Sequence, residues 1–324
     1  MESAKEAFAE CEVGVTGEAV AVPKQESHRV SHVRPVQPRP SIRSRRIEED
    51  PCVKVQGLSR SFGNGCAYCL DPRAVLERNR CPRCGTVHAV RDVGFELYSG
   101  EIVGIVGESG SGKSTLMQCL YFDQTASSGS IFVKPYDGGH RNILELSSQE
   151  KRRIRNTVFG MVYQNPYLGL RMDYSSLSNI AEQMIASGDR SVFHMRSRGE
   201  ELLGQVNIPT VRATDPPRTF SGGMQQRVQI AKALSNNPPV LLLDEVTTGL
   251  DLSVQANVLD LILQIRRDFN VSMLVVSHDL GVIRMLADRT FVMLDGRVIE
   301  EGLTDQIRED PQHAYTQQLV YSLL

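Results

Sequence analysis

One segment combines glycines, a lysine and a hydroxyl residue in the order GxxxxGK[ST]: Gly107-Glu108-Ser109-Gly110-Ser111-Gly112-Lys113-Ser114. Such a loop can bind a nucleotide because its glycines let backbone N–H groups turn towards phosphates. We expect Lys113 to neutralise the β and γ phosphates and the Ser114 hydroxyl to ligate Mg²⁺. A plain glycine turn is the alternative, and the number of matching features weighs against it. The expected nucleotide contacts of this segment are Gly107, Ser109, Gly110, Gly112, Lys113, Ser114 and Thr115.

Two adjacent acids follow the apolar run Val240–Leu243, which is typical of a buried parallel strand. Asp244 is predicted to hold Mg²⁺, directly or through water. Glu245 is predicted to accept a proton from the attacking water. Acids that merely cap a loop at a strand end are the alternative, which the phosphate loop makes the weaker interpretation.

Four cysteines form two CxxC pairs, Cys66-x-x-Cys69 and Cys81-x-x-Cys84, with eleven residues between them. This spacing predicts a structural metal site with four thiolate ligands, closed to substrates. Zinc is the favoured ion and iron the alternative, while a disulfide pair or free thiols would leave the site without metal. We therefore interpret residues 63–88 as a zinc-knuckle insert.

The remaining chain must position these groups, and its apolar patterns alternate between strands and helices. Strands are expected around 53–58, 93–97, 102–106, 240–243, 273–276 and the hairpin 291–301, which turns at Asp295-Gly296. Helices are expected over 114–120, from Ser147, within 174–206, and over 222–235, 254–269 and 280–287. This alternation predicts an α/β layered fold. No internal repeat is visible, so a single nucleotide-binding unit is expected.

The motifs together resemble the ATP-binding cassette (ABC) ATPases over residues 53–324. Ser221-Gly222-Gly223-Met224-Gln225 is similar to the cassette signature, Gly249-Leu250-Asp251 to the D-loop, and Gln164 to the Q-loop glutamine. His278 resembles the switch histidine, and Phe62 stands where an aromatic residue stacks on adenine; a strand-end core aromatic is the alternative for Phe62. The resemblance implies a mixed-sheet core, an antiparallel β subdomain and a helical signature subdomain.

This resemblance also implies that ATP hydrolysis needs a second cassette, identical or paralogous, with the signature residues Ser221 and Gly223 contacting ATP bound to the partner. Asp251 of the D-loop is also expected to contact nucleotide. Glu245, His278, Gln164 and Lys113 would be catalytic, with Ser114, Gln164 and Asp244 holding Mg²⁺. One departure is Val246, where the family usually has proline. Valine leaves the rigidity of this loop, and hence the hydrolysis rate, open.

Two branches of the family are candidates. The segments 250–256 and 310–316 resemble oligopeptide importer ATPases, which work with a membrane permease. The run Gln164-Asn165-Pro166-Tyr167-Leu168-Gly169-Leu170-Arg171 is instead similar to the ATP-binding subunits of phosphonate carbon–phosphorus lyase systems, which dock on a soluble enzyme core. The insert is not a general feature of either branch. We favour the lyase branch, with soluble lyase subunits as partners.

Other interpretations are weaker. A DNA-repair cassette would normally join two cassettes in one chain, although Arg73, Arg78, Arg80 and Arg83 in the insert leave weak nucleic-acid contact possible. A cassette that binds ATP without hydrolysing it is suggested only by Val246.

Residues 1–50, rich in arginine and proline, are predicted to be a disordered extension, with a docking arm as the alternative. A net charge near −2, seven cysteines and no apolar run of about 20 residues favour a cytoplasmic protein.

Overall fold

The computed structural model describes residues 50–69, 71 and 74–321. The predicted N-terminal extension, apart from Asp50, and Arg73 of the insert lie outside the described residues. The described residues all belong to one compact unit, Arg46–Leu324.

A six-stranded sheet forms the centre of this unit, in the order β5-β6-β7-β3-β8-β9. The strands are β3 (Ile102–Val106), β5 (Phe159–Val162), β6 (Val240–Asp244), β7 (Ser272–Val276), β8 (Arg289–Leu294) and β9 (Arg297–Leu303). All neighbours are parallel except β8 and β9, which form an antiparallel hairpin. Every residue of β3, β5, β6 and β7 is buried, as expected for parallel strands covered on both faces. The expected turn at Asp295-Gly296 is confirmed, with φ of 48° and 78°.

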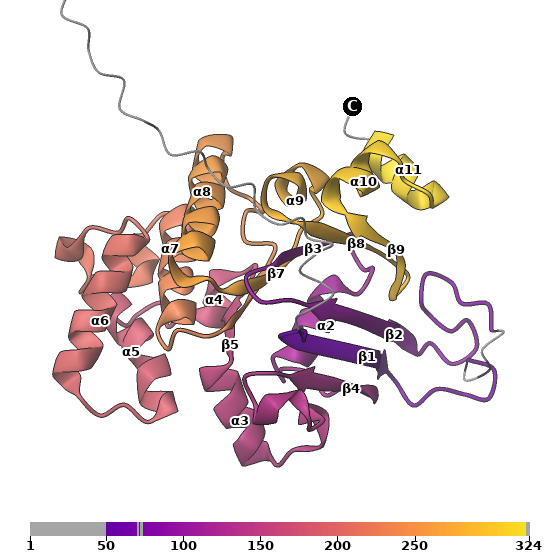
Figure 1. Cartoon of the computed structure of the whole chain (residues 1–324), viewed down its shortest axis with the longest axis horizontal. Coiled ribbons are helices and arrows are strands. Elements are labelled where there is room, and N and C mark those ends of the chain that lie inside the picture. Colours follow the sequence, from indigo (N-terminus) through magenta and orange to yellow (C-terminus); the bar gives the residue numbers. More distant parts are fainter. Residues whose placement is uncertain (1–49, 70, 72–73, 322–324) are drawn as a thin grey trace, which may run out of the picture. The chain divides into compact units, whose positions relative to one another are not determined.

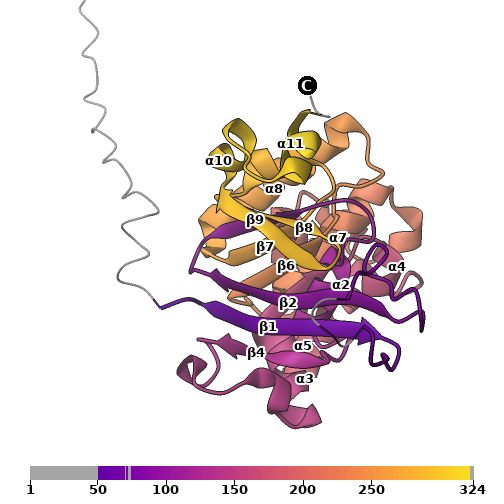
Figure 2. The ribbon, with the colours of Figure 1, turned by 90° about the vertical axis from the view of Figure 1, so that its right-hand side faces the viewer.

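A smaller antiparallel sheet has the order β2-β1-β4. Its strands are β1 (Val53–Phe62), β2 (Val87–Leu97) and β4 (Ser128–Val133). Helix α2 (Lys113–Leu120) contributes Leu116, Met117 and Leu120 to a core shared with residues of both sheets. Figure 2 shows the smaller sheet beside the central one, with α2 close to β2. The phosphate loop thus lies between a buried strand and a helix fixed by both sheets.

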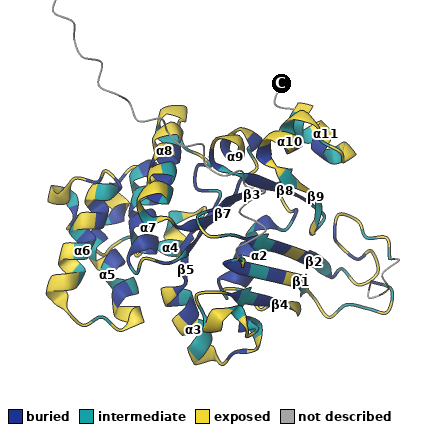
Figure 3. Cartoon of the chain, viewed as in Figure 1, coloured by how far each residue is buried: buried dark blue, intermediate teal, exposed yellow. Residues whose placement is uncertain are grey.

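The remaining helices include a helical subdomain made of α5, α6 and α7, which contact one another (Figure 1). The α-helices are α3 (Ser148–Thr157), α4 (Pro166–Gly169), α5 (Ser176–Ser187), α6 (Val192–Gln205), α7 (Gly222–Leu234), α8 (Leu252–Phe269), α9 (Leu280–Leu286), α10 (Thr304–Glu309) and α11 (Ala314–Tyr321). Short 3₁₀ helices span Asp137–Gly139, Ile143–Glu145, Thr210–Arg212 and Pro217–Thr219. Figure 3 shows exposed residues along the outer sides of α5 and α6, while the central strands are buried.

The expected mixed-sheet core, antiparallel β subdomain and helical subdomain are confirmed. The capping box at the start of α3 is also present, because Ser147 Oγ accepts from Glu150 N and the Glu150 carboxylate accepts from Ser147 N. Strands β4 and β5 and helices α10 and α11 were not expected from the sequence. No helix among the described residues is long and apolar enough to cross a lipid bilayer.

Candidate functional site

The candidate nucleotide site lies where the phosphate loop meets the carboxyl end of β6. A hollow of about 440 Å³ opens there. Its lining comprises Phe62, Asn79, Val87, Ala89, Ser109, Gly110, Gly112, Lys113, Ser114, Thr115, Gln164 and Glu245. Carboxyl ends of parallel strands are the usual binding edge of such sheets. Residues expected from four separate sequence motifs are therefore brought together in one pocket.

The glycines of the phosphate loop permit its close approach to neighbouring backbone. A Cβ at Gly112, whose φ is 103°, would lie 2.0 Å from the Ala89 carbonyl oxygen of β2. A Cβ at Gly107 would lie 2.2 Å from the Met293 carbonyl oxygen of β8. The loop is thus held between two strands at distances that only glycine allows.

Lys113 is the buried cation of the pocket, with 4% of its surface exposed. Its Nζ donates to the carbonyl oxygens of Gly107 at 2.8 Å and Glu108 at 2.9 Å. Burial lowers the pKa of this amine, while the carboxylates of Glu245, Asp244 and Glu108 oppose that shift. The side chain is therefore held within the loop that would surround the phosphates.

Ser114 and Asp244 form a pair of oxygen ligands suited to magnesium. Ser114 Oγ donates to Asp244 Oδ1 at 3.0 Å, although the two residues are 130 positions apart. Burial, with a contribution from Glu245, raises the pKa of the Asp244 carboxyl to about 6, against the Ser114 hydrogen bond and the charge of Lys113. A hydroxyl and a carboxylate at this distance fit the hard oxygen coordination of Mg²⁺.

Glu245 is the centre of a second set of contacts. Its Oε2 accepts from Gln164 Nε2 at 3.0 Å and from Thr248 Oγ1 at 3.2 Å, and lies 3.3 Å from His278 Nδ1. Its φ of 47° is unusual for a residue other than glycine, a feature that clusters at functional sites. Three of the residues expected to be catalytic, Glu245, Gln164 and His278, therefore meet at one carboxylate oxygen. Thr248 was missed, because a threonine within a turn carries no separate sequence signal.

The signature residues lie elsewhere. Ser221 caps helix α7 by accepting from Met224 N at 3.4 Å, and a Cβ at Gly223 would lie 2.3 Å from Val254 Cγ1 of helix α8. Asp251 is exposed at the start of α8. Ser221, Gly223 and Asp251 are absent from the lining of the pocket around the chain's own phosphate loop.

Two glutamines on α7, which the sequence reasoning missed, hold the Q-loop. Gln229 accepts from Tyr163 N at 2.7 Å and donates to Tyr163 O at 3.2 Å. Gln226 donates to Gln164 O at 3.1 Å. Both side chains are buried, and the signal that could have found them is two amides on the apolar face of a helix. The helix that starts with the signature thereby fixes the backbone that carries Gln164.

The four predicted cysteine ligands converge in the segment between β1 and β2. Their sulfur atoms all lie within 4.8 Å of one another. The Sγ–Sγ distances are 3.8 Å for Cys66–Cys69 and Cys66–Cys81, and 3.7 Å for Cys69–Cys84. Four thiolates about 2.3 Å from one zinc ion would be about 3.8 Å apart, so the cluster fits zinc.

Thr86 supports this cluster. Its hydroxyl hydrogen-bonds to Cys84 Sγ at 3.2 Å and accepts from Gly65 N at 3.1 Å. The contacts with Thr86 lower the pKa of the Cys84 thiol to about 6, which favours the thiolate form that binds metals. Against a hydrogen bond with the Cys66 backbone, burial and the neighbouring thiols raise the pKa of the Cys69 thiol to about 11.

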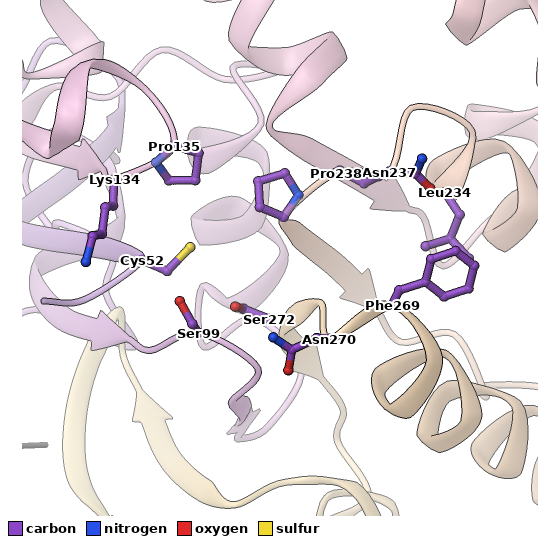
Figure 4. Close-up of a pocket in the computed structure, with 11 residues that line it drawn as sticks. Cys52, Ser99, Lys134, Pro135, Leu234, Asn237, Pro238, Phe269, Asn270 and Ser272 are labelled. Atoms are coloured by element: carbon purple, nitrogen blue, oxygen red, sulfur yellow. The ribbon is translucent and has the colours of Figure 1, made fainter. Parts of the chain in front are cut away.

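A second hollow, at the amino ends of the central strands, has a different character (Figure 4). Cys52, Ser99, Lys134 and Ser272 line it together with prolines and apolar side chains. Burial raises the pKa of the Cys52 thiol, so it is a poor nucleophile. None of the predicted site residues lies in this hollow.

Comparisons with known proteins agree with the geometry of the nucleotide site. A family model described as "ABC transporter" matches residues 90–248. The putative phosphonates utilization ATP-binding protein PhnK of Escherichia coli is 46% identical over 233 residues, which cover 72% of this chain and 90% of the relative. The oligopeptide transport ATP-binding protein OppD of Bacillus subtilis is 38% identical over 250 residues, 74% of this chain and 67% of the relative.

Solved structures of ATP-binding cassettes are also similar to this chain. The ATP-binding cassette MJ0796, solved as a dimer in a post-hydrolysis state bound to ADP and Pi, matches with a TM-score of 0.65 and 28% identity, covering 78% of this chain and 98% of the cassette. The protein cbiO1 of Clostridium perfringens, described as part of the ABC transporter complex cbiONQ, gives a TM-score of 0.66 at 26% identity, covering 81% of this chain and 92% of the other. The chain belongs to the ATP-binding cassette family of ATPases.

Proposed function

We propose that this ATPase drives a phosphonate carbon–phosphorus lyase complex through MgATP-dependent pairing with a second cassette. The convergence of Gln164, Glu245 and His278 beside the phosphate loop supports the hydrolytic step. The 46% identity to PhnK, against 38% to OppD, supports the phosphonate branch.

The proposed mechanism assigns each residue a role. Phe62, 41% exposed at the edge of the pocket, stacks on adenine, and Lys113 neutralises the terminal phosphates. Ser114 and Asp244, with Gln164, hold Mg²⁺, which when bound would neutralise charge on the transferred phosphoryl group. Glu245 accepts the proton of the attacking water.

His278 and Gln164 orient Glu245 in this scheme. His278, whose side chain is about half exposed beside the carboxylate, would also contact the γ-phosphate, as the family resemblance implies. Thr248 adds a third hydrogen bond to the same oxygen. These contacts fix the position of the Glu245 carboxylate, on a backbone that has an unusual positive φ.

The location of the signature supports pairing with a second cassette. Ser221, Gly223 and Asp251 lie outside the chain's own pocket, where a neighbouring cassette would meet them. The dimeric state of MJ0796 supports such pairing. The N-terminus of helix α7 carries a partial positive charge, which would favour contact with a γ-phosphate.

The branch choice is tested by mild affinity purification of the full chain from native cells, followed by mass measurement of the assembly. We expect a large assembly of non-membrane enzyme subunits that is recovered without detergent. The alternative is the motor of a peptide or nickel-type importer, which the similarity to OppD favours. Recovery only in detergent with membrane-spanning partners would overturn the lyase assignment and leave the ATPase assignment intact.

We propose zinc as the ion of the cysteine cluster, with Cys66, Cys69, Cys81 and Cys84 as its ligands. The sulfur spacing supports a tetrahedral four-thiolate site, which would be structural because it has no open position. Native mass spectrometry of freshly purified chain should show one zinc ion per chain. Iron in its place, or no metal, would contradict this assignment.

A further inference from the structure

Asn79 connects the cysteine cluster to the phosphate loop. Its side-chain Nδ2 donates to the Gly110 carbonyl oxygen at 3.2 Å, and Asn79 is among the residues lining the nucleotide pocket. Asn79 is 9% exposed and Gly110 is exposed, so this contact is partly shielded from solvent. A partly buried hydrogen bond of this kind restrains the loop more than a fully exposed one, because water competes with it less.

A tight turn presents this side chain. Glu77 and Arg80 exchange backbone hydrogen bonds of 2.9 Å in both directions. Arg78 and Asn79 between them have φ of 45° and 59°, the pattern of a two-residue hairpin turn. Asparagine is among the few residues that adopt this left-handed conformation at low cost. The Asn79 carbonyl also accepts from His88 N at 2.8 Å, which ties the turn to β2.

This turn leads directly into the second CxxC pair. Cys81 lies two residues after Asn79, and its N–H donates to Thr86 O at 2.8 Å. Arg80 also pairs with Val87 at the start of β2. A metal ion held by the four thiolates would therefore fix the base of the turn, while Gly110 receives its tip. The described part of 63–86 contains no helix, and its β pairing consists of single bridges.

We propose that Asn79 is a positioning residue of the phosphate loop, and that metal in the cysteine cluster raises the affinity for ATP by holding Asn79 against Gly110. The coupling rests on the zinc site proposed above, whereas the Asn79 contact itself does not. The insert thus acts on the chain's own nucleotide site.

The test measures the affinity of the full-length chain for a non-hydrolysable ATP analogue by calorimetry, together with metal content by native mass spectrometry. Asn79→Gly removes the side chain and retains the left-handed backbone, while Asn79→Asp replaces the donor by an acceptor that faces a carbonyl. Both should weaken binding about three- to tenfold, the range of one hydrogen bond, with the metal retained. In steady-state assays KM for ATP should rise by the same factor and kcat should stay unchanged, because Glu245 keeps its partners.

The coupling is tested by the double variant Cys81→Ser/Cys84→Ser, alone and combined with Asn79→Gly. Loss of metal should weaken binding as much as Asn79→Gly does, and the combination should weaken it no further. Asn207→Gly is the matched control, since Asn207 is an exposed asparagine with φ of 56° at the end of α6, and it should leave binding unchanged.

Unchanged affinity in Asn79→Gly would overturn the positioning role, whether or not the cysteine variant folds. Additive losses in the combined variant would overturn the coupling through Asn79. Wild-type chain without metal would overturn both the zinc assignment and the coupling. In that case the Asn79→Gly result would still decide the positioning role by itself.

Discussion

Gln164 Nε2 donates a 3.0 Å hydrogen bond to Glu245 Oε2, joining the end of β5 to the end of β6. The Gln164 backbone is in turn held by Gln226 of helix α7, the helix whose first turn contains the signature. A contiguous set of contacts therefore links the segment that would face a partner cassette to the carboxylate that would activate water.

Glu245→Gln should separate binding from hydrolysis. The amide has the shape of the carboxylate and cannot accept the proton of water, so the rate of phosphate release should fall at least about 100-fold. Affinity for MgATP should stay within about threefold of the wild type. The matched control is Glu200→Gln on α6, where the half-buried Glu200 pairs with Arg196, and it should leave both quantities unchanged. Residual hydrolysis near the wild-type rate would remove Glu245 from the role of base.

The magnesium dependence of ATP binding should follow the protonation of Asp244. Its pKa is raised to about 6 from 3.8, so the carboxylate that binds Mg²⁺ is lost as the pH falls through 6. The gain in ATP affinity that Mg²⁺ produces should therefore drop about tenfold between pH 7 and pH 5. Asp244→Asn should show only the pH dependence of the nucleotide itself. An equal pH dependence in both proteins would contradict this prediction.

The raised pKa of Asp244 also affects the stability of the fold, which it lowers at neutral pH. A carboxyl with a folded pKa of about 6 and an unfolded pKa near 3.8 contributes stability below pH 3.8, and that contribution is lost as the pH rises through 6. Without nucleotide, Asp244→Asn should therefore raise the melting temperature at pH 7.5. A lower melting temperature would show that the Ser114 hydrogen bond outweighs the burial of the charge.

Gly112→Ala should damage the phosphate loop, whereas Gly204→Ala should not. The first change places a Cβ 2.0 Å from the Ala89 carbonyl at a φ of 103°, and the backbone strain alone costs about 1–2 kcal/mol. ATP affinity should fall more than tenfold and the melting temperature should drop. Gly204 lies within α6, where an added Cβ would meet no atom within 4 Å, so alanine should stabilise the fold by about 0.5–1 kcal/mol. Calorimetry and thermal unfolding measure both effects.

The sequence allowed the central strands and the phosphate loop to be predicted because their signals are local. The runs Ile102–Val106 and Val240–Asp244 are continuous and apolar, and the structure places strands there. Strand β4 was missed because Ser128, Gly129 and Ser130 give no period-two pattern, and its pairing with β1 is a tertiary effect. Strand β5 is only four residues long, too short for periodicity to identify.

Contacts between distant segments were the least accessible part of the site. The proximity of Ser114 and Asp244 was expected from their two motifs, because each motif comes at the end of a buried strand. Asn79 and Thr248 belong to no motif, and their roles depend on how turns fold onto the pocket. Tyr315 is similar: its hydroxyl accepts from Glu108 N at 2.8 Å, which brings helix α11 to the phosphate loop from 207 positions away.

Mixing two inactive variants should restore hydrolysis if two copies of this chain form the ATP sites. Ser221→Arg places a bulky cation at the start of α7 and leaves the chain's own phosphate loop intact, so it should bind ATP and fail to hydrolyse it. In a mixed dimer with Glu245→Gln, one site contains both altered residues and the other contains neither. About a quarter of the wild-type rate per chain is then expected, because half of random pairs are mixed and each has one intact site. Each variant alone, which forms dimers of two identical copies, is the control. A mixture that is no more active than either variant alone would indicate a paralogous partner, or a signature that acts on the ATP site of its own chain.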